Sequence, residues 1–399
     1  MGLPVFIAGA GVISAIGNNT TECISAFRKG EAGIGDIVYL DTIHRTKIPV
    51  AEVKLSNQEL AAASNWLPEI SRTALLSLTA AKEALADASI ENLSGFRTGF
   101  VSANTVGGMD KTEEFFKEFI SNPAKGKLRN LIHHECGSIT ELVADRLGIN
   151  QFMTTISTAC SSSANAIIFA ARMIKHGMLD VAVAGGVDAL TRFTLNGFNT
   201  LMILDQDPCK PFDEHRKGLN IGEGAGYVVL VSERVLKQMN KPAYCLLSGY
   251  CNANDAYHQT ASSPEGKGPY LAMQGALQQS GLAPSAINYI NLHGTGTQNN
   301  DIAEGTAIKK LFDPLYPAMS STKSFTGHTL GASGSMEAVF SALAVQQGFI
   351  YPNLRFETAM KELPFIPQTV FLAHQTVEHA LSNSFGFGGN CSSLIFSKV

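Results

Sequence analysis

The sequence predicts a layered α/β fold. Apolar, β-branched runs alternate with segments of helical spacing along the whole chain, a pattern typical of strands covered by helices. Hydrophobic residues make up 45% of the 399 residues and charged residues 16%, which favours a large core and excludes disorder. Many of the 37 glycines gather in short runs at 185–186, 222–226 and 386–389, where we expect sharp turns near a site.

The first part of the chain contains strand and helix patterns in turn. We expect strands at 5–13, 99–103, 153–157, 179–184 and 225–232, and helices at 21–29, 71–86 and 160–176.

The pattern restarts after Lys241-Pro242. Strands are expected at 244–250, 287–292 and 379–384, and helices at 269–280 and 335–347. Both parts share the rhythm of strand, helix, strand and glycine turn, which hints at a duplication. We expect two halves, 1–240 and 241–399, that share one continuous core.

Composition excludes several classes of protein. The net charge is −4, and 30 basic residues are well mixed with 34 acidic ones, so there is no overall basic field for nucleic acid. No apolar stretch is long enough to span a membrane, and the start of the chain lacks a signal peptide's basic region. Seven irregularly spaced cysteines argue against a disulfide framework, and we expect a cytoplasmic protein.

Familiar cofactor and metal motifs are absent. Gly9-Ala10-Gly11 is followed by Ser14 and not by a third glycine, so the dinucleotide fingerprint fails. The sequence contains no Walker A loop, no Cys-x-x-Cys pair, no His-Glu-x-x-His and no Gly-x-Ser-x-Gly elbow. The run HHEC at 133–136 is interpreted as a loop, because adjacent side chains rarely converge on one ion. We expect neither a metal nor an organic cofactor.

Cys160 is a candidate nucleophile. It lies between a β-branched strand and an apolar helix, in the small-residue run TACSSSA. Unpaired N–H groups and the dipole at a helix N-terminus favour thiolate, and we expect a pKa below the ordinary ~8.5. The alternative is a buried, inert cysteine.

Two histidines follow in glycine-rich settings. His293 begins HGTGT after a predicted strand, and His328 ends KSFTGH, which starts at Lys323. Glycine beside a histidine permits close approach of backbone or ligand, although each histidine alone is compatible with a core role. With Cys160, they form a plausible cluster of nucleophile, hydrogen-bond donors and cation.

These motifs resemble the β-ketoacyl-acyl-carrier-protein synthases, in particular the elongating type with a Cys-His-His site. The similarity runs through the whole chain in order: VFIAGAGVIS at the start, the Cys160 segment, KPFD from 210, GEGAG at 222–226, DAYHQT at 255–260, HGTGTQNND from 293, KSFTGH, and NSFGFGG at 383–389. The resemblance implies a thiolase-like fold, two similar α/β halves in a five-layered α-β-α-β-α arrangement, and a dimer.

The resemblance also implies roles for the clustered residues. Cys160 would accept the acyl group, and His293 and His328 would hold the malonyl thioester carbonyl as carbon dioxide leaves. Lys323 would organise the site electrostatically, with Glu337 as its partner.

Further residues would complete such a site. The backbone N–H groups of Cys160 and Phe387 would form an oxyanion hole, and the Phe387 side chain would gate the pocket. Thr295, Thr297 and Thr260 would bind a phosphopantetheine arm.

The implied reaction is the decarboxylative condensation of a Cys160-bound acyl chain with malonyl-loaded acyl carrier protein, in fatty-acid, polyene or polyketide-type elongation. No cofactor is expected, because the phosphopantetheine arm belongs to the carrier protein. The partner subunit would be a second copy or a related chain.

The sequence departs from the family pattern at a few positions. Asn390-Cys391 replaces the usual Thr-Asn, Lys210 replaces an arginine, KGLN at 217–220 replaces an acidic-aromatic run, and Ala15 stands where proline is common. These departures favour a specialised branch that builds polyenes, resorcinols or polyketide-like chains.

Two features bear on substrate and partner. Val106, in the turn Val106-Gly107-Gly108, occupies the region where relatives limit chain length, and a modest side chain there would admit longer acyl groups. Lys125, Lys127 and Arg129 are either a solvated loop or a landing patch for an acidic carrier protein.

Two alternatives remain open. One is a non-catalytic partner subunit that determines chain length in a ketosynthase heterodimer, although such subunits typically lack the nucleophile. The other is a thiolase-like hydrolase or acyltransferase that uses Cys160 without condensation.

Overall fold

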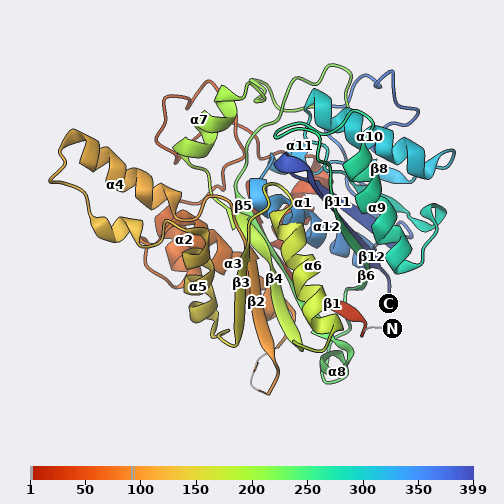
Figure 1. Ribbon diagram of the computed structural model, residues 1–399, viewed down its shortest axis with the longest axis horizontal. Helices are drawn as coiled ribbons and strands as arrows, with labels where there is room; N and C mark the ends of the chain where they lie inside the picture. Colours follow the sequence, from red (N-terminus) through yellow and green to blue (C-terminus); the bar gives the residue numbers. More distant parts are fainter. Residues whose placement is uncertain (1–2, 91–92, 94) are drawn as a thin grey trace.

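A single ten-stranded sheet runs through the computed structural model, which describes residues 3–90, 93 and 95–399 (Figure 1). The order of its strands is β3-β2-β4-β5-β1-β6-β12-β11-β7-β8. The strands are β1 (Val5–Ser14), β2 (Thr98–Ala103), β3 (Phe152–Ile156), β4 (Val181–Asp188), β5 (Gly224–Ser232), β6 (Cys245–Asn254), β7 (Tyr289–Asn291), β8 (Ala318–Ser320), β11 (His379–Phe385) and β12 (Asn390–Ser397). A separate ribbon pairs β9 (Phe349–Ile350) with β10 (Leu372–Ala373).

The sheet consists of one five-strand pattern used twice. In the first five strands, β2 is parallel to β3 and β4, whereas β5 is antiparallel to β4 and β1. In the second five, β7 is parallel to β8 and β11, whereas β12 is antiparallel to β11 and β6. The two patterns meet where β1 pairs with β6, with Phe6 opposite Leu246.

Helices complete five layers, α-β-α-β-α. The layer on the first five strands contains α3 and α5, the layer on the second five contains α9 and α10, and α6 and α12 pack against each other between the two parts of the sheet. Their bounds are α3 (Arg72–Asp87), α5 (Cys136–Leu147), α6 (Ser162–Lys175), α9 (Lys267–Ser280), α10 (Gln298–Phe312) and α12 (Ser333–Gln347). The expected layered α/β fold of two similar halves is therefore present.

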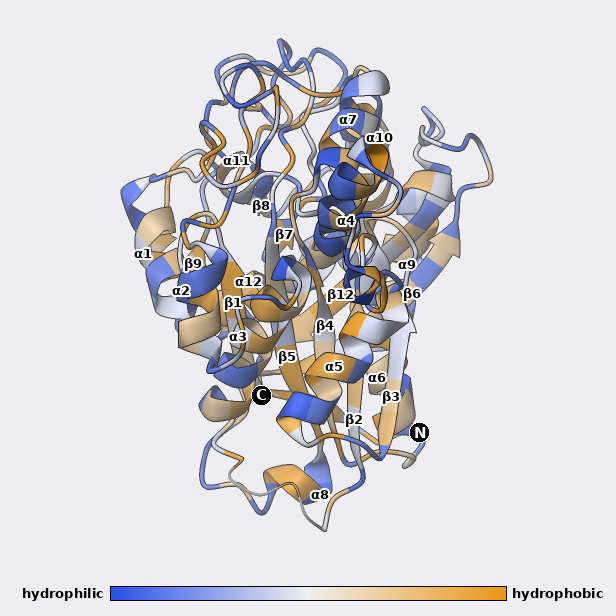
Figure 2. Cartoon of the chain, turned by 90° about the vertical axis from the view of Figure 1, so that its left-hand side faces the viewer, coloured by the Kyte–Doolittle hydropathy of each residue, from blue (hydrophilic) through white to orange (hydrophobic). Residues whose placement is uncertain are grey.

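The core follows from the composition of these elements. Every residue of α12 from Ser333 to Val345 is buried, as expected for a helix with small and apolar residues on all sides. The strands β4 and β5 are buried along their whole length, and Figure 2 shows apolar colour along them. Helices α6 and α12 both begin at the same end of the sheet, so their first turns lie close together.

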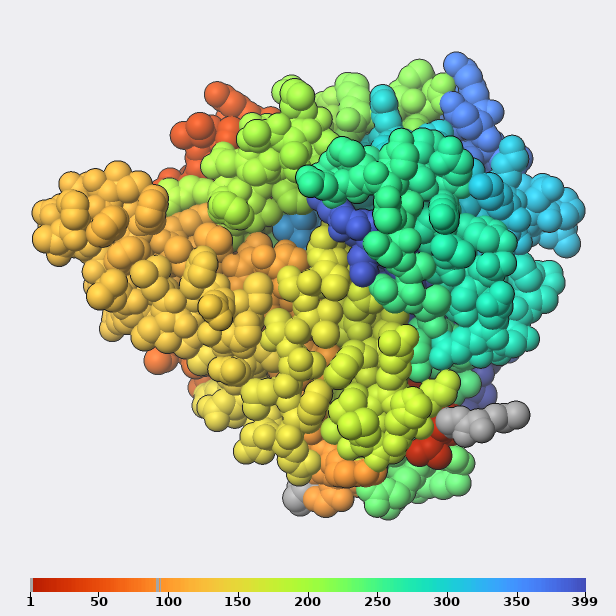
Figure 3. Space-filling model, viewed as in Figure 1, coloured from red at the N-terminus to blue at the C-terminus, as the bar shows by residue number. Residues whose placement is uncertain are grey.

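Other helices lie outside the five layers. They are α1 (Thr20–Lys29), α2 (Asn57–Ser64), α4 (Met109–Ser121), α7 (Arg192–Thr200), α8 (Glu233–Leu236) and α11 (Lys323–Thr326), with 3-10 turns η1 (Leu128–Leu131), η2 (Pro284–Ala286), η3 (Leu330–Ala332) and η4 (Phe387–Gly389). Helix α4 and η1 project from one side of the molecule, at the left in Figures 1 and 3. Within the described part of the chain, no helix combines the length and apolar character that a membrane crossing needs.

Most of the predicted strands and helices are confirmed to within a few residues, but the turns expected at two of the three glycine runs are wrong. The central helix α6 begins at Ser162 and not at Cys160. Gly185 and Gly186 lie inside β4, and Gly224 and Gly226 lie inside β5, so neither run forms the expected turn. A Cβ on Gly186 would come within 2.7 Å of the Ser163 Cβ, so glycine there allows α6 to pack closely on the strand.

Candidate active site

Cys160 lies in the elbow between β3 and α6, two residues before the helix. Ala159 has φ +53°, a left-handed conformation that is uncommon for a residue with a side chain. Such strain persists where the surroundings enforce it, often at functional sites. The elbow places the Cys160 side chain, 5% exposed, at the N-terminal end of α6.

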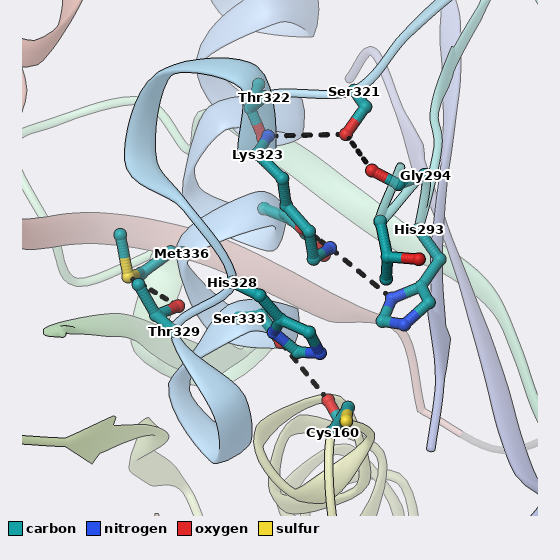
Figure 4. A network of polar contacts seen from close by, with 12 residues as sticks. Cys160, His293, Gly294, Ser321, Thr322, Lys323, His328, Thr329, Ser333 and Met336 are labelled. Carbon is teal, nitrogen blue, oxygen red and sulfur yellow. Dashed lines mark hydrogen bonds and ion pairs between the residues drawn. The ribbon is translucent and has the colours of Figure 1, made fainter. Parts of the chain in front are cut away.

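Two histidines from the second half of the chain face this cysteine (Figure 4). His293 follows β7, and His328 lies between α11 and η3. The Cys160 sulfur and one ring nitrogen from each histidine all lie within 4.8 Å of one another. The structure therefore brings together the three residues that the sequence singled out.

A backbone hydrogen bond fixes the tautomer of His328. The N–H of Leu330 donates to His328 Nδ1 across 3.1 Å. A neutral imidazole whose Nδ1 accepts a hydrogen bond carries its proton on Nε2. Leu330 has φ +52°, so a second strained residue stands beside the site.

Lys323 fixes the tautomer of His293. Its Nζ lies 3.3 Å from His293 Nδ1, and an ammonium group offers donors only. The proton of the His293 ring is therefore on Nε2 as well. Lys323 is 1% exposed and forms an ion pair with Glu337, the partner expected from the sequence.

Both imidazoles are neutral at physiological pH. Burial lowers the pKa of His293 and of His328 well below the ordinary value, and the Lys323 charge lowers both further. A neutral ring with its proton on Nε2 is a hydrogen-bond donor. The site thus presents two neutral N–H donors beside a sulfur atom.

The hydrogen bonds around the rings oppose metal binding. Cysteine with two histidines is a donor set that zinc accepts. A histidine that binds a metal through one nitrogen normally donates a hydrogen bond from the other. Here Nδ1 of His328 accepts a hydrogen bond and Nδ1 of His293 faces an ammonium group, so neither Nε2 offers a lone pair.

The expected low pKa of Cys160 is wrong for this structure. Burial raises the pKa of the thiol to about 11, against the lowering effects of the Phe387 N–H, the Lys323 charge and the cysteine's own N–H. The position of Cys160 near a helix N-terminus indicated the groups that stabilise its thiolate. It did not indicate that burial removes water from the thiol. The resting side chain is a thiol.

Two cavities meet at Cys160. A narrow one of about 90 Å³ is lined by His293 and His328 and by the predicted arm-binding residues Thr260, Thr295 and Thr297. The hydroxyls of Thr295 and Thr297 lie 2.8 Å apart.

The second cavity, about 400 Å³, is almost wholly apolar. Its lining includes Cys160, Thr105, Val106, Phe193, Thr194, Gly197, Phe198, Leu201, Leu330 and Phe387. The Phe387 ring lines both cavities and stacks on Phe198, with ring centroids 6.0 Å apart. Of the residues predicted for the site, Lys323 and Glu337 line neither cavity; Lys323 contacts His293, and Glu337 pairs with Lys323.

Sequence reasoning missed three residues that support the site. Glu304 accepts hydrogen bonds from the N–H groups of His293 and Gly294. Asp188 accepts from the N–H groups of Thr105, Val106 and Gly331, so it ties the cavity wall to the turn after His328. Asn390 accepts from Ser161, beside the cysteine.

One signal could have pointed to one of these residues. Glu304 lies 11 residues after His293, on the helix that follows the glycine-rich loop. An acidic residue at such a place commonly caps a turn. Asn390 was marked only as a departure from the family pattern, and no local pattern indicates Asp188, because the partners of both lie in remote segments.

The repeated five-strand pattern and the nucleophile elbow at a central helix define a thiolase-like protein. Models of the beta-ketoacyl synthase N-terminal and C-terminal domains match residues 3–235 and 244–357. The chain belongs to the β-ketoacyl synthase family.

Curated and solved relatives agree with this assignment. A 3-oxoacyl-[acyl-carrier-protein] synthase 2 of Staphylococcus aureus is 32% identical over 410 residues, covering 99% of this chain and 98% of its own. The solved ishigamide ketosynthase/chain length factor superposes with a TM-score of 0.93 at 27% identity, covering 100% of both chains. A type II polyketide synthase ketosynthase, solved with its acyl-carrier protein and bound to the hexaketide, gives 0.88 at 26% identity, again covering 100% of both chains.

Proposed function

We propose that this protein is a β-ketoacyl-acyl-carrier-protein synthase that extends an acyl chain held on Cys160. The observation that carries the proposal is the convergence of the Cys160 sulfur with the ring nitrogens of His293 and His328 within 4.8 Å. A thiol between two neutral N–H donors suits thioester exchange and enolate formation.

The first step is transfer of the acyl group. The Cys160 sulfur forms a bond to the carbonyl carbon of the donor thioester, and the bond from that carbon to the carrier's sulfur breaks. The proton lost by Cys160 ends on the departing carrier thiol. The N–H groups of Cys160 and Phe387, both of which face the sulfur, stabilise the oxyanion.

The second step joins two carbons. The bond between the malonyl carbon and its carboxylate breaks, carbon dioxide leaves, and the electron pair remains as an enolate. Nε2–H of His293 and of His328 donate to the enolate oxygen. The enolate carbon then attacks the carbonyl carbon of the Cys160 thioester, the bond from that carbon to sulfur breaks, and the departing thiolate takes up a proton from solvent water.

Lys323 and Glu337 would serve this step through His293. Lys323 holds Nδ1 as an acceptor, so the ring keeps its proton on Nε2. Glu337 balances the buried ammonium charge, which would otherwise be costly to bury. This chemistry uses no metal and no cofactor of the enzyme's own.

The two cavities fit the two parts of the substrate. The apolar cavity would receive the acyl chain, with Val106 limiting its length. The narrow cavity would receive the phosphopantetheine arm, with Thr295, Thr297 and Thr260 as hydrogen-bond partners and Phe387 as the gate.

The partner that delivers both substrates would be an acyl carrier protein. Lys125, Lys127 and Arg129 are exposed on the projecting segment, and Leu128 and Ile132 beside them are 72% and 65% exposed. Basic and apolar groups side by side suit an acidic carrier protein, because such a surface offers both charge attraction and buried area.

The subunit organisation and the pathway belong to the same proposal. The halves 1–240 and 241–399 would each supply part of the site, the first Cys160 and the second both histidines with Lys323. We expect a homodimer or a pair with a related subunit, in the cytoplasm. The curated relatives are 3-oxoacyl-[acyl-carrier-protein] synthases at 32% identity and the solved polyketide-type ketosynthases are 26–27% identical, so the expectation of a specialised elongation pathway rests on sequence departures such as Asn390-Cys391.

Intact-protein mass spectrometry tests the function. The protein is incubated with hexanoyl carrier protein and then with malonyl carrier protein. We expect a hexanoyl adduct that is lost in the Cys160→Ala variant, followed by a β-ketooctanoyl carrier product. Absence of an adduct would indicate the non-catalytic partner subunit, and an adduct that only hydrolyses would indicate a hydrolase.

A further inference from the structure

Two loops from opposite halves of the chain touch beside the nucleophile. One is the elbow 158–161, and the other is the glycine-rich loop 386–389 between β11 and β12, which Asn390 follows as the first residue of β12. A Cβ on Gly386 would lie 3.2 Å from the Cys160 backbone nitrogen and 3.2 Å from Ser161 Oγ. The loops are therefore packed against each other with no room for a side chain at Gly386.

A cluster of amides and hydroxyls joins the same two loops. Asn390 Oδ1 accepts hydrogen bonds from Asn165 Nδ2 at 2.8 Å, from Asn252 Nδ2 at 2.7 Å and from Ser161 Oγ at 2.7 Å, where it shares the single hydroxyl proton with the Thr158 carbonyl oxygen at 2.8 Å. Three donors on one oxygen fix the orientation of the Asn390 amide. Asn390 is thus held by α6, by β6 and by the residue after Cys160.

The glycine-rich loop needs such a restraint. Gly388 and Gly389 have φ of +79° and +82°, and glycine resists rotation less than any other residue. The loop carries the Phe387 N–H, whereas the elbow carries the Cys160 N–H. Because the two N–H groups lie on separate segments, their spacing depends on what ties the segments together.

We propose that the hydrogen bond between Asn390 and Ser161 is a latch that sets the spacing of the Cys160 and Phe387 N–H groups. Asn390 and Ser161 are positioning residues, since neither lines the two cavities at Cys160. The inference rests on the proposed function, because the two N–H groups form an oxyanion hole only if Cys160 attacks a thioester.

Two reactions of Cys160 separate this role from a merely structural one. Acylation by hexanoyl-N-acetylcysteamine passes through an oxyanion, whereas alkylation by iodoacetamide does not. We expect Asn390→Ala and Ser161→Ala each to slow acylation about tenfold, less than the 10²–10³ lost with an oxyanion donor. Alkylation should slow less than acylation, because the same two N–H groups only lower the pKa of the Cys160 thiol there.

Two further variants sharpen the test. The double variant Asn390→Ala/Ser161→Ala should be no slower than the slower single variant, because the latch is the bond that both changes remove. Ser392→Ala is the matched control, since Ser392 Oγ contacts Asn165 and Asn252 in the same cluster but does not reach the elbow. It should leave both rates unchanged.

The outcomes that overturn the latch are distinct. Equal slowing of acylation and alkylation by Asn390→Ala would make Asn390 a structural residue, and unchanged acylation would make the bond dispensable. Failure of the unaltered protein to accept any acyl group, despite normal alkylation, would instead refute the proposed function and with it the oxyanion role of the latch.

Discussion

The backbone N–H of Leu330 donates a hydrogen bond to Nδ1 of His328 across 3.1 Å. This single contact decides which nitrogen of the ring carries the proton and therefore what the ring can do. With its proton on Nε2 and its pKa lowered by burial, His328 is a neutral donor and neither a base nor a metal ligand.

A graded series at His328 tests the donor role. His328→Ala removes the donor, so release of carbon dioxide from malonyl carrier protein should fall by roughly 10²–10³. His328→Asn supplies an amide N–H and should lose less. The rate of decarboxylation is measured on protein already acylated at Cys160.

Acylation of Cys160 is the internal control for this series. The proposed first step does not use His328, so both variants should still take up hexanoyl groups at a comparable rate. An asparagine variant no better than the alanine variant would show that His328 acts by something other than N–H donation.

The raised pKa of Cys160 predicts an unusual pH dependence of alkylation. Only the thiolate reacts, and below the pKa its fraction grows tenfold with each pH unit. Since burial raises the pKa to about 11, the rate of alkylation by iodoacetamide should keep rising between pH 7 and 9.5 without a plateau. The Cys160→Ser variant gives the background from the other cysteines.

A plateau at or below pH 8.5 would contradict this prediction. It would mean that the surrounding N–H groups, the Lys323 charge and the helix N-terminus outweigh the loss of water. The same profile recorded on Asn390→Ala would show whether the glycine-rich loop contributes to that balance.

The elements that the sequence predicted are those with strong local signals. Strand β5 is rich in β-branched and other apolar residues, and helix α12 is rich in alanine and other small or apolar residues, so the local sequence identifies both. Helices α2, α4, α5, α7 and α10 were not predicted. Helix α4 has no buried residue and α7 only Thr194 and Leu195, so neither has a broad buried apolar face. The strand order could not be predicted, since it depends on pairing between segments far apart in the chain.

The residues of the candidate site likewise divide into those with a local sequence signal and those without one. Cys160, His293 and His328 lie in local motifs of small residues and glycine, so a pattern could indicate each of them. Asp188 accepts a hydrogen bond from the N–H of Gly331, which is 143 residues away, and only the fold reveals that contact. The pKa of Cys160 was predicted with the wrong sign because burial is a property of the folded chain.

The apolar cavity predicts control of product length by Val106. Its side chain is 7% exposed and lines the cavity beside Cys160. Val106→Phe should fill the space and shorten the longest product, as measured by mass spectrometry of the products. Val106→Ile adds a single methylene and should change the distribution little, so a similar shift in both variants would indicate a general disturbance.

The exposed basic residues on the projecting segment predict a defect limited to carrier substrates. Lys125→Glu with Lys127→Glu should raise the apparent KM for acyl carrier protein roughly tenfold at low salt, because charge attraction speeds encounter. The Debye screening length is ~10 Å at 0.1 M ionic strength and falls with added salt, so the defect should shrink as salt is added. The KM for hexanoyl-N-acetylcysteamine should stay the same.

Lys237→Glu with Lys398→Glu alters the net charge equally, near α8 and the C-terminus, and should leave both values unchanged. An equal defect with both substrates would show that the reversal disturbs the site itself, and a defect in the control pair would show that net charge, and not this patch, governs docking.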